Sequence, residues 1–143
     1  MPIRAVYAGS LDGSGPIYKE IQVNNTQTIN EGDIVVLATG KASIAAAGAA
    51  AGTVLGVSNT SIVTTTATAN DIIKYDANPN SLYRMTYTGA ATPAIGTKYD
   101  LGAAAYQFNS DDTTGGYIQV VEKVDTTNKD AVVLLRNRVF TGN

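Results

Sequence analysis

The chain has 143 residues and a formal net charge of −2, a length that suits one domain of ordinary size. Its ten basic residues are scattered from Arg4 to Arg138, which argues against nucleic-acid binding because phosphate contacts require clustered lysine and arginine. The absence of cysteine and histidine excludes disulfides, thiolate zinc sites, cysteine nucleophiles and the commonest general base.

The first 17 residues differ from the rest of the chain. Glycines and a proline separate apolar residues that follow neither the period of a strand nor that of a helix. A frayed terminus is one interpretation, but disordered segments are poor in aromatic and β-branched residues. We therefore predict an extended N-terminal arm over 1–17 that lies on a neighbouring protein surface. Its expected contact residues, with the first residue after it, are Ile3, Val6, Tyr7, Leu11, Ile17 and Tyr18.

Short strand-like runs separated by turn residues fill the region after the arm. The runs cover 18–23, 33–38, 53–58, 62–66, 72–75, 82–88, 98–101, 105–108, 117–124 and 131–137. Turns are expected at 39–41, 76–81, 109–116 and 125–130, where Asn, Asp, Gly and Pro gather. Within 82–88, one face of the expected strand carries Leu82, Arg84 and Thr86, and the other carries Tyr83, Met85 and Tyr87. Short, regularly spaced strands of this kind predict a sandwich or a barrel.

An alanine-rich stretch at 45–51 interrupts this pattern. Alanine is the best helix former, but Gly48 lies in the middle of the stretch and Gly52 follows it. Isolated helices shorter than about 12–15 residues are marginal even when they are rich in alanine. We expect a connector, with at most one short Ala-rich helix inside 42–52. The predicted fold is therefore mainly β, with 18–143 forming a single β-domain.

Carboxylates are the obvious candidates for catalysis. They occur as Asp111 with Asp112, Glu31 with Asp33, and Asp125 with Asp130. All lie next to Asn, Gly or Thr, where Asp commonly caps turns. The loop 109–116 offers oxygen ligands but lacks the calcium-loop pattern, so a turn is favoured there and an ion site stays open. We expect no enzymatic activity and no catalytic, cofactor or metal residues.

The surface chemistry favours protein contacts. Charged residues make up 15% of the chain, below the usual share of about 25%, so a partner is expected to cover part of the surface unless Thr, Ser and Asn keep it soluble. Eight tyrosines stand against two phenylalanines and no tryptophan, and tyrosine suits interfaces as well as strand edges. The N-terminal residues lack a signal-peptide core and no run approaches the length of a membrane span, so a soluble protein made in the cytoplasm is expected.

Several motifs, taken in order, resemble one known family. The run 29–37 contains a Gly-Asp-hydrophobic strand, and it is followed by Gly40, the Ala/Gly connector and the Leu-Gly-Val strand of 54–58. Further on, 94–101 ends in Tyr-Asp-Leu, and the strands 117–124 and 131–140 close the pattern. Over residues 29–140 this order is similar to that of the small capsid decoration (cement) proteins of tailed bacteriophages.

The resemblance implies a small β-barrel or β-tulip-like domain, commonly a homotrimer, on the outer surface of the mature virion. The major capsid protein would be its partner, and the bound protein would hold neighbouring capsid subunits against internal DNA pressure. Members of the family differ in oligomeric state and in which terminus touches the capsid. Two alternatives stay open: a host- or glycan-binding head-fibre or tail-tip module, and a self-assembling tube subunit.

Overall fold

The computed structural model describes residues 4–140, and this part of the chain contains thirteen β-strands and no helix. The mainly β fold is thereby confirmed. The strands are β1 (Val6–Ser10), β2 (Tyr18–Gln22), β3 (Thr28–Ile29), β4 (Ile34–Ala38), β5 (Lys41–Ile44), β6 (Val54–Val57), β7 (Ile62–Val63), β8 (Ile72–Asp76), β9 (Ser81–Thr88), β10 (Lys98–Tyr99), β11 (Gln107–Asn109), β12 (Ile118–Asp125) and β13 (Asp130–Leu135).

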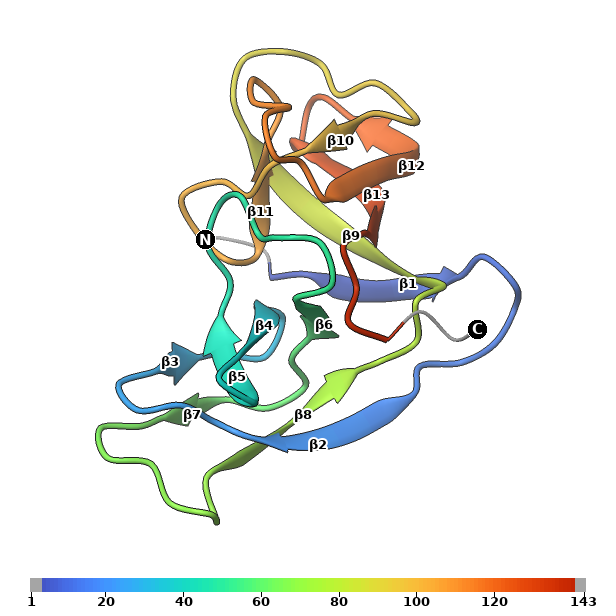
Figure 1. Ribbon diagram of the computed structural model, residues 1–143. Helices are drawn as coiled ribbons and strands as arrows, with labels where there is room; N and C mark the ends of the chain where they lie inside the picture. Colours follow the sequence, from blue (N-terminus) through green and yellow to red (C-terminus); the bar gives the residue numbers. More distant parts are fainter. Residues whose placement is uncertain (1–3, 141–143) are drawn as a thin grey trace.

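The largest sheet has six strands and is built around β9 (Figure 1). One edge of β9 pairs with β13, which continues through β12 to β10. The other edge pairs first with β1, over residues 81–84, and then with β11, over residues 86–88. Only the β9–β11 pairing is parallel among the pairings of this sheet. Two separate segments of the chain thus share one edge of the central strand.

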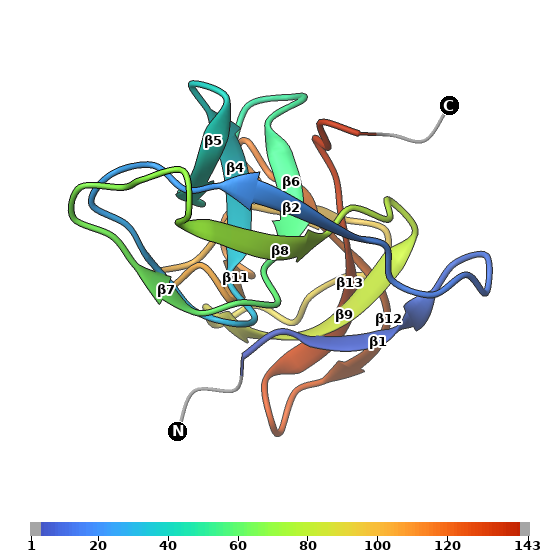
Figure 2. The same cartoon turned by 90° about the horizontal axis from the view of Figure 1, so that it is seen from below.

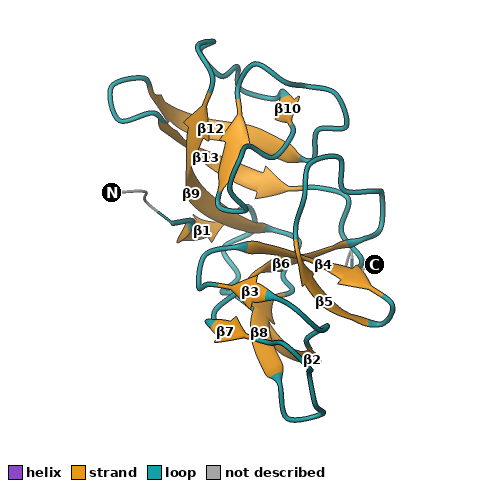
Figure 3. Cartoon of the chain, turned by 90° about the vertical axis from the view of Figure 1, so that its left-hand side faces the viewer, coloured by secondary structure: helices purple, strands orange, loops and turns teal. Residues whose placement is uncertain are grey.

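The other strands form three small antiparallel sheets in the opposite half of the molecule (Figure 3). Their pairings are β2 with β8, β3 with β7, and β4 between β5 and β6. These sheets meet one another, and the end of the chain, through single bridges such as Val23 to Ala42, Ser58 to Tyr75 and Val54 to Arg138. Closure into a barrel requires continuous pairing around the ring. The described strands therefore make four separate sheets and do not close the barrel that the sequence suggests.

Two apolar clusters lie on opposite sides of β4, and the larger one joins the two halves of the molecule. Ile34 points into the larger cluster, which lies against the six-stranded sheet, while Val35 points into the smaller one. β6 does the same with Val54 and Leu55. Successive side chains of a strand face opposite sides, so one strand supplies both cores.

The alanine-rich stretch forms no helix. Turns occupy 47–48 and 51–52, and both Gly48 and Gly52 have positive φ angles of 73° and 76°, which glycine adopts without steric cost. The Gly48 amide donates a hydrogen bond to Asp100 at 2.7 Å. The connector predicted from sequence is confirmed, and tertiary contacts rather than helical hydrogen bonds hold it in place.

Residues 4–17, which we call the N-terminal segment, lie on the molecule's own surface instead of projecting from it. β1 runs beside β9 at the margin of the molecule (Figure 2). Beyond β1, the amide of Leu11 donates to the carbonyl of Asn80, and the carbonyl of Ile17 accepts from the amide of Ala77. These bonds satisfy backbone groups that an extended arm would leave to solvent or to a partner. Contact of this segment with a neighbouring protein stays a prediction.

Candidate functional site

The described residues among those predicted for a protein contact remain at the surface, and three hollows adjoin them. Ile3 lies outside the described residues. Val6 and Tyr7 lie on β1, Tyr18 begins β2, and Leu11 and Ile17 lie in the loop between the two strands. Val6, Leu11, Ile17 and Tyr18 keep between 46% and 55% of their surface exposed, so apolar area along this segment is available to a partner.

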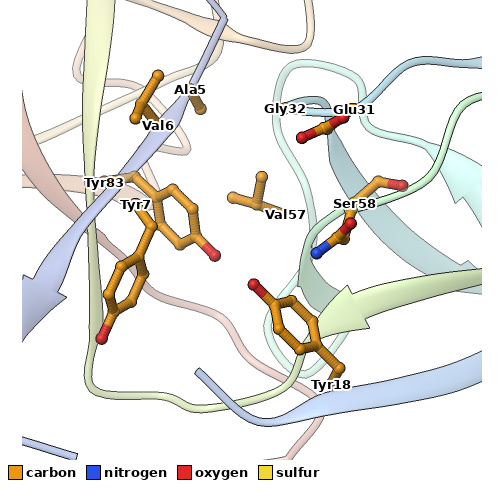
Figure 4. Close-up of a pocket in the computed structure, with 10 residues that line it drawn as sticks. Ala5, Val6, Tyr7, Tyr18, Glu31, Gly32, Val57, Ser58 and Tyr83 are labelled. Atoms are coloured by element: carbon orange, nitrogen blue, oxygen red, sulfur yellow. The ribbon is translucent and has the colours of Figure 1, made fainter. Parts of the chain in front are cut away.

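The first hollow, which we call the tyrosine pocket, brings Val6, Tyr7 and Tyr18 together (Figure 4). It is about 280 Å³ in volume and lies between β1 and β9 on one side and β2 and β6 on the other. The residues that line it are Ala5, Val6, Tyr7, Tyr18, Glu31, Gly32, Val57, Ser58, Asn59 and Tyr83. Sequence analysis placed only three of these in a common site, because all the others except Ala5 come from distant parts of the chain.

Strand pairing explains the aromatic side of the tyrosine pocket. Tyr7 and Tyr83 are directly opposite each other on β1 and β9, and their rings meet edge to face with centroids 5.8 Å apart. Residues opposite each other in an antiparallel pair share a face of the sheet. Tyr18 comes from β2 and faces the pocket from the other side (Figure 4).

The tyrosine hydroxyls have different roles. Tyr83 donates to a carboxylate oxygen of Asp76 at 2.7 Å, and burial together with this bond raises the pKa of Tyr83 far above its usual value. Tyr7 donates to the carbonyl of Ser14 at 3.2 Å. Within residues 4–140 the Tyr18 hydroxyl makes no hydrogen bond, and neither does the exposed carboxylate of Glu31. The pocket therefore offers an unused hydroxyl and an unused negative charge.

A buried polar network, which we call the Asp76 network, lies behind this pocket. Asp76 is 1% exposed, and one of its oxygens accepts from the amides of Ile17 at 3.1 Å and Asn78 at 3.0 Å. The buried guanidinium of Arg138 donates to the Asp76 carbonyl at 2.9 Å. Burial lowers the pKa of Arg138, while the nearby Asp76 charge opposes that change. The network joins the N-terminal loop, the end of β8 and the C-terminal segment.

The second hollow, of about 590 Å³, is mostly apolar and is lined in part by Ile17. Ile17, Tyr75, Ala77, Pro79 and Phe140 form its apolar surface, with Lys19 and Glu20 beside them. Phe140 is half exposed and was not singled out by sequence analysis. Leu11 lines a third hollow, which includes Pro79 and Leu134. The N-terminal segment therefore runs past three neighbouring concave surfaces.

Except for Glu31, the carboxylates considered for catalysis cap turns or form ion pairs within residues 4–140. Asp112 and Asp125 accept backbone amides two residues further on, and Asp33 accepts the amide of Asn30. Asp130 pairs with Arg84, and Asp33 pairs with Arg4. Within residues 4–140, no three His, Cys, Asp or Glu side chains are grouped so that they could hold a metal ion. The same residues include no helix able to cross a membrane.

Asp111 secures a loop and provides a pH test. Its two oxygens accept the amides of Ala90 at 2.9 Å and Ala91 at 3.0 Å, and these bonds lower its pKa. A carboxylate with a lowered pKa in the folded state stabilises the fold above the unfolded pKa of about 3.9, and this contribution is lost as pH falls through the folded value.

We expect Asp111→Asn to be less stable than the wild type at neutral pH, because the amide nitrogen of Asn cannot accept a backbone N–H. The difference should shrink as pH falls below about 4. Urea unfolding of both proteins from pH 7 to pH 2.5 measures it, and a difference that stays constant over this range would contradict the assigned role.

No protein-family model matches the chain, and no curated protein shows significant similarity to it.

Proposed function

We propose that the chain is a structural capsid decoration protein that binds the outer surface of a tailed-phage head and strengthens contacts between major capsid protein subunits. It acts as a homo-oligomer, with a trimer favoured by the resemblance of residues 29–140 to this family. Two of the motifs that carry the resemblance are neighbours in the fold: β4, which directly follows Gly32 and Asp33, pairs with β6, which contains the Leu-Gly-Val element.

The observation that carries the proposal is the exposed apolar surface along the N-terminal segment. Leu11, Ile17 and Tyr18 are about half exposed, and Phe140 lies beside Ile17. Contiguous apolar surface on a soluble protein commonly marks a contact with another protein. Each square ångström of apolar surface buried contributes about 25 cal/mol, so a protein that works through contact area gains from such a segment.

The experiment adds purified protein to heads assembled from the major capsid protein of the same phage. We expect the double variant Leu11→Ser, Ile17→Ser to bind these heads roughly 10-fold more weakly, because two partly buried aliphatic side chains are lost from the contact. Bound wild-type protein should raise the temperature at which the heads break, and bound variant should raise that temperature by a smaller amount.

The matched control is Val63→Ser, Ile95→Ser. Val63 on β7 and Ile95 in the loop before β10 are even more exposed than Leu11 and Ile17, and neither lines any of the three hollows that adjoin the N-terminal segment. The control should bind as the wild type does. Equal affinity of both double variants, or no binding of the wild type, would refute the proposed contact.

A further inference from the structure

The tyrosine pocket combines aromatic walls with an unpaired negative charge. We propose that it is a binding site for a primary ammonium group, and that its occupant is a lysine side chain of a partner protein. This inference goes beyond the proposed function, because it depends on the chemistry of the pocket and holds for any partner that presents a lysine.

The aromatic walls suit a cation. A ring attracts a positive charge placed near its face because the face carries negative electrostatic potential. Tyr7 and Tyr83 line one side of the pocket, and Tyr18 lines the other (Figure 4). Donation of the Tyr83 hydroxyl to the Asp76 carboxylate increases the electron density of that ring. The pocket surface is thus favourable to an alkylammonium group, whose methylenes also contact the rings.

The charges around the pocket also favour a positively charged occupant. Glu31 is the one charged residue in the lining, and no lysine or arginine from the described part of the chain belongs to it. Arg4 lines an adjoining hollow with Glu31, but its guanidinium pairs with Asp33 at 3.4 Å and lies 5.3 Å from the centroid of the Tyr106 ring. Arg138 lies behind Tyr83, where it donates to the carbonyl of Asp76. Glu31 and the unused Tyr18 hydroxyl are therefore available to accept from an ammonium group.

The size of the pocket limits the occupant. Sites for drug-sized ligands usually measure about 300–1,000 Å³. The tyrosine pocket, at about 280 Å³, suits a single side chain better than an oligosaccharide. A lysine side chain fits a small pocket because its aliphatic stem is slim. The ammonium at its end is a compact positive charge that complements the Glu31 carboxylate.

The test is an NMR titration of the intact protein with Nα-acetyl-L-lysine methylamide. We expect saturable shifts of the amide signals of Tyr7, Tyr18, Glu31 and Ser58. The norleucine analogue, which has the stem without the charge, should bind about 10-fold more weakly or not at all. Glu31→Gln should weaken binding of the lysine compound about 10-fold, because it removes the charge and keeps the shape.

The matched control is Glu20→Gln, which removes an exposed carboxylate that lies outside this pocket. It should leave the affinity unchanged. Equal binding of the lysine and norleucine compounds, stronger binding of methyl α-glucoside, no saturable shift, or equal effects of the two variants would each overturn the inference. Leu11 and Ile17 do not line this pocket, so the outcome is separate from that of the head-binding experiment.

Discussion

Replacing Gly56 by alanine is expected to remove about 3–5 kcal/mol of folding stability, a large part of the total for a domain of this kind. Gly56 lies in β6, opposite Val35 of β4, with a φ of 154°. A Cβ atom at this position would lie 2.0 Å from the carbonyl oxygen of Asp76 and 3.3 Å from Nη1 of Arg138. The first distance is a hard clash with backbone, so β6 and β8 would have to separate.

Urea denaturation measures this effect, through the midpoint and the slope of the transition. Gly40→Ala is the matched control, since Gly40 also has a positive φ of 77° but nothing lies within 4 Å of the added methyl group. Gly40→Ala should lower the folding stability by only about 1–2 kcal/mol, which is the cost of holding an alanine at a positive φ. Gly15→Ala, with no positive φ and open space, should change stability by less than about 0.5 kcal/mol. If Gly56→Ala lost no more folding stability than Gly40→Ala, the strands would have moved to relieve the clash at little cost in free energy, and the prediction would be wrong.

Local periodicity explains which parts of the fold follow from the sequence. The alternation within 82–88 places Tyr83, Met85 and Tyr87 in the main core, while Leu82 joins a smaller cluster on the outer face of the sheet. The side-chain period of two decides this assignment without knowledge of the partner strand. The glycine inside the alanine stretch likewise predicts a connector with at most one short helix, and the described residues contain no helix there.

Long-range pairing explains what the sequence leaves open. The pairing of β1 with β9 depends on backbone groups that every residue carries, so composition does not reveal which edge the N-terminal segment joins. The tyrosine pocket needs Tyr7, Glu31 and Tyr83 from three distant segments. Arg138 and Asp76 are 62 residues apart, and each reads as an ordinary surface or turn residue in its local context. These contacts exist only once the sheets have assembled.

The Asp76 network gives the second large effect, and Asp76→Ala is expected to cost about 3–5 kcal/mol. The carboxylate is the acceptor for the amides of Ile17 and Asn78 and for the hydroxyl of Tyr83, and all three donors would lose their partner. A buried donor without an acceptor costs about 1–3 kcal/mol. The variant would also leave the buried guanidinium of Arg138 without the negative charge that most favours its protonated form.

Asp76→Asn separates the backbone hydrogen bonds from the charge. The single amide oxygen of Asn can still accept from the backbone amides of Ile17 and Asn78. Its amide nitrogen cannot accept from the Tyr83 hydroxyl, so this variant loses the charge beside Arg138 and the acceptor of Tyr83 but keeps both backbone hydrogen bonds. We expect a stability between those of the wild type and Asp76→Ala, measured by urea unfolding, with Glu20→Ala as a surface control within about 0.5 kcal/mol of the wild type. Hydrogen exchange adds a local readout: the amides of Ile17 and Asn78 should exchange faster in Asp76→Ala than in Asp76→Asn, because only the alanine variant lacks their acceptor. If both variants were as stable as the wild type and kept these amides protected, the Asp76 network would not be what fastens the N-terminal loop to the end of β8.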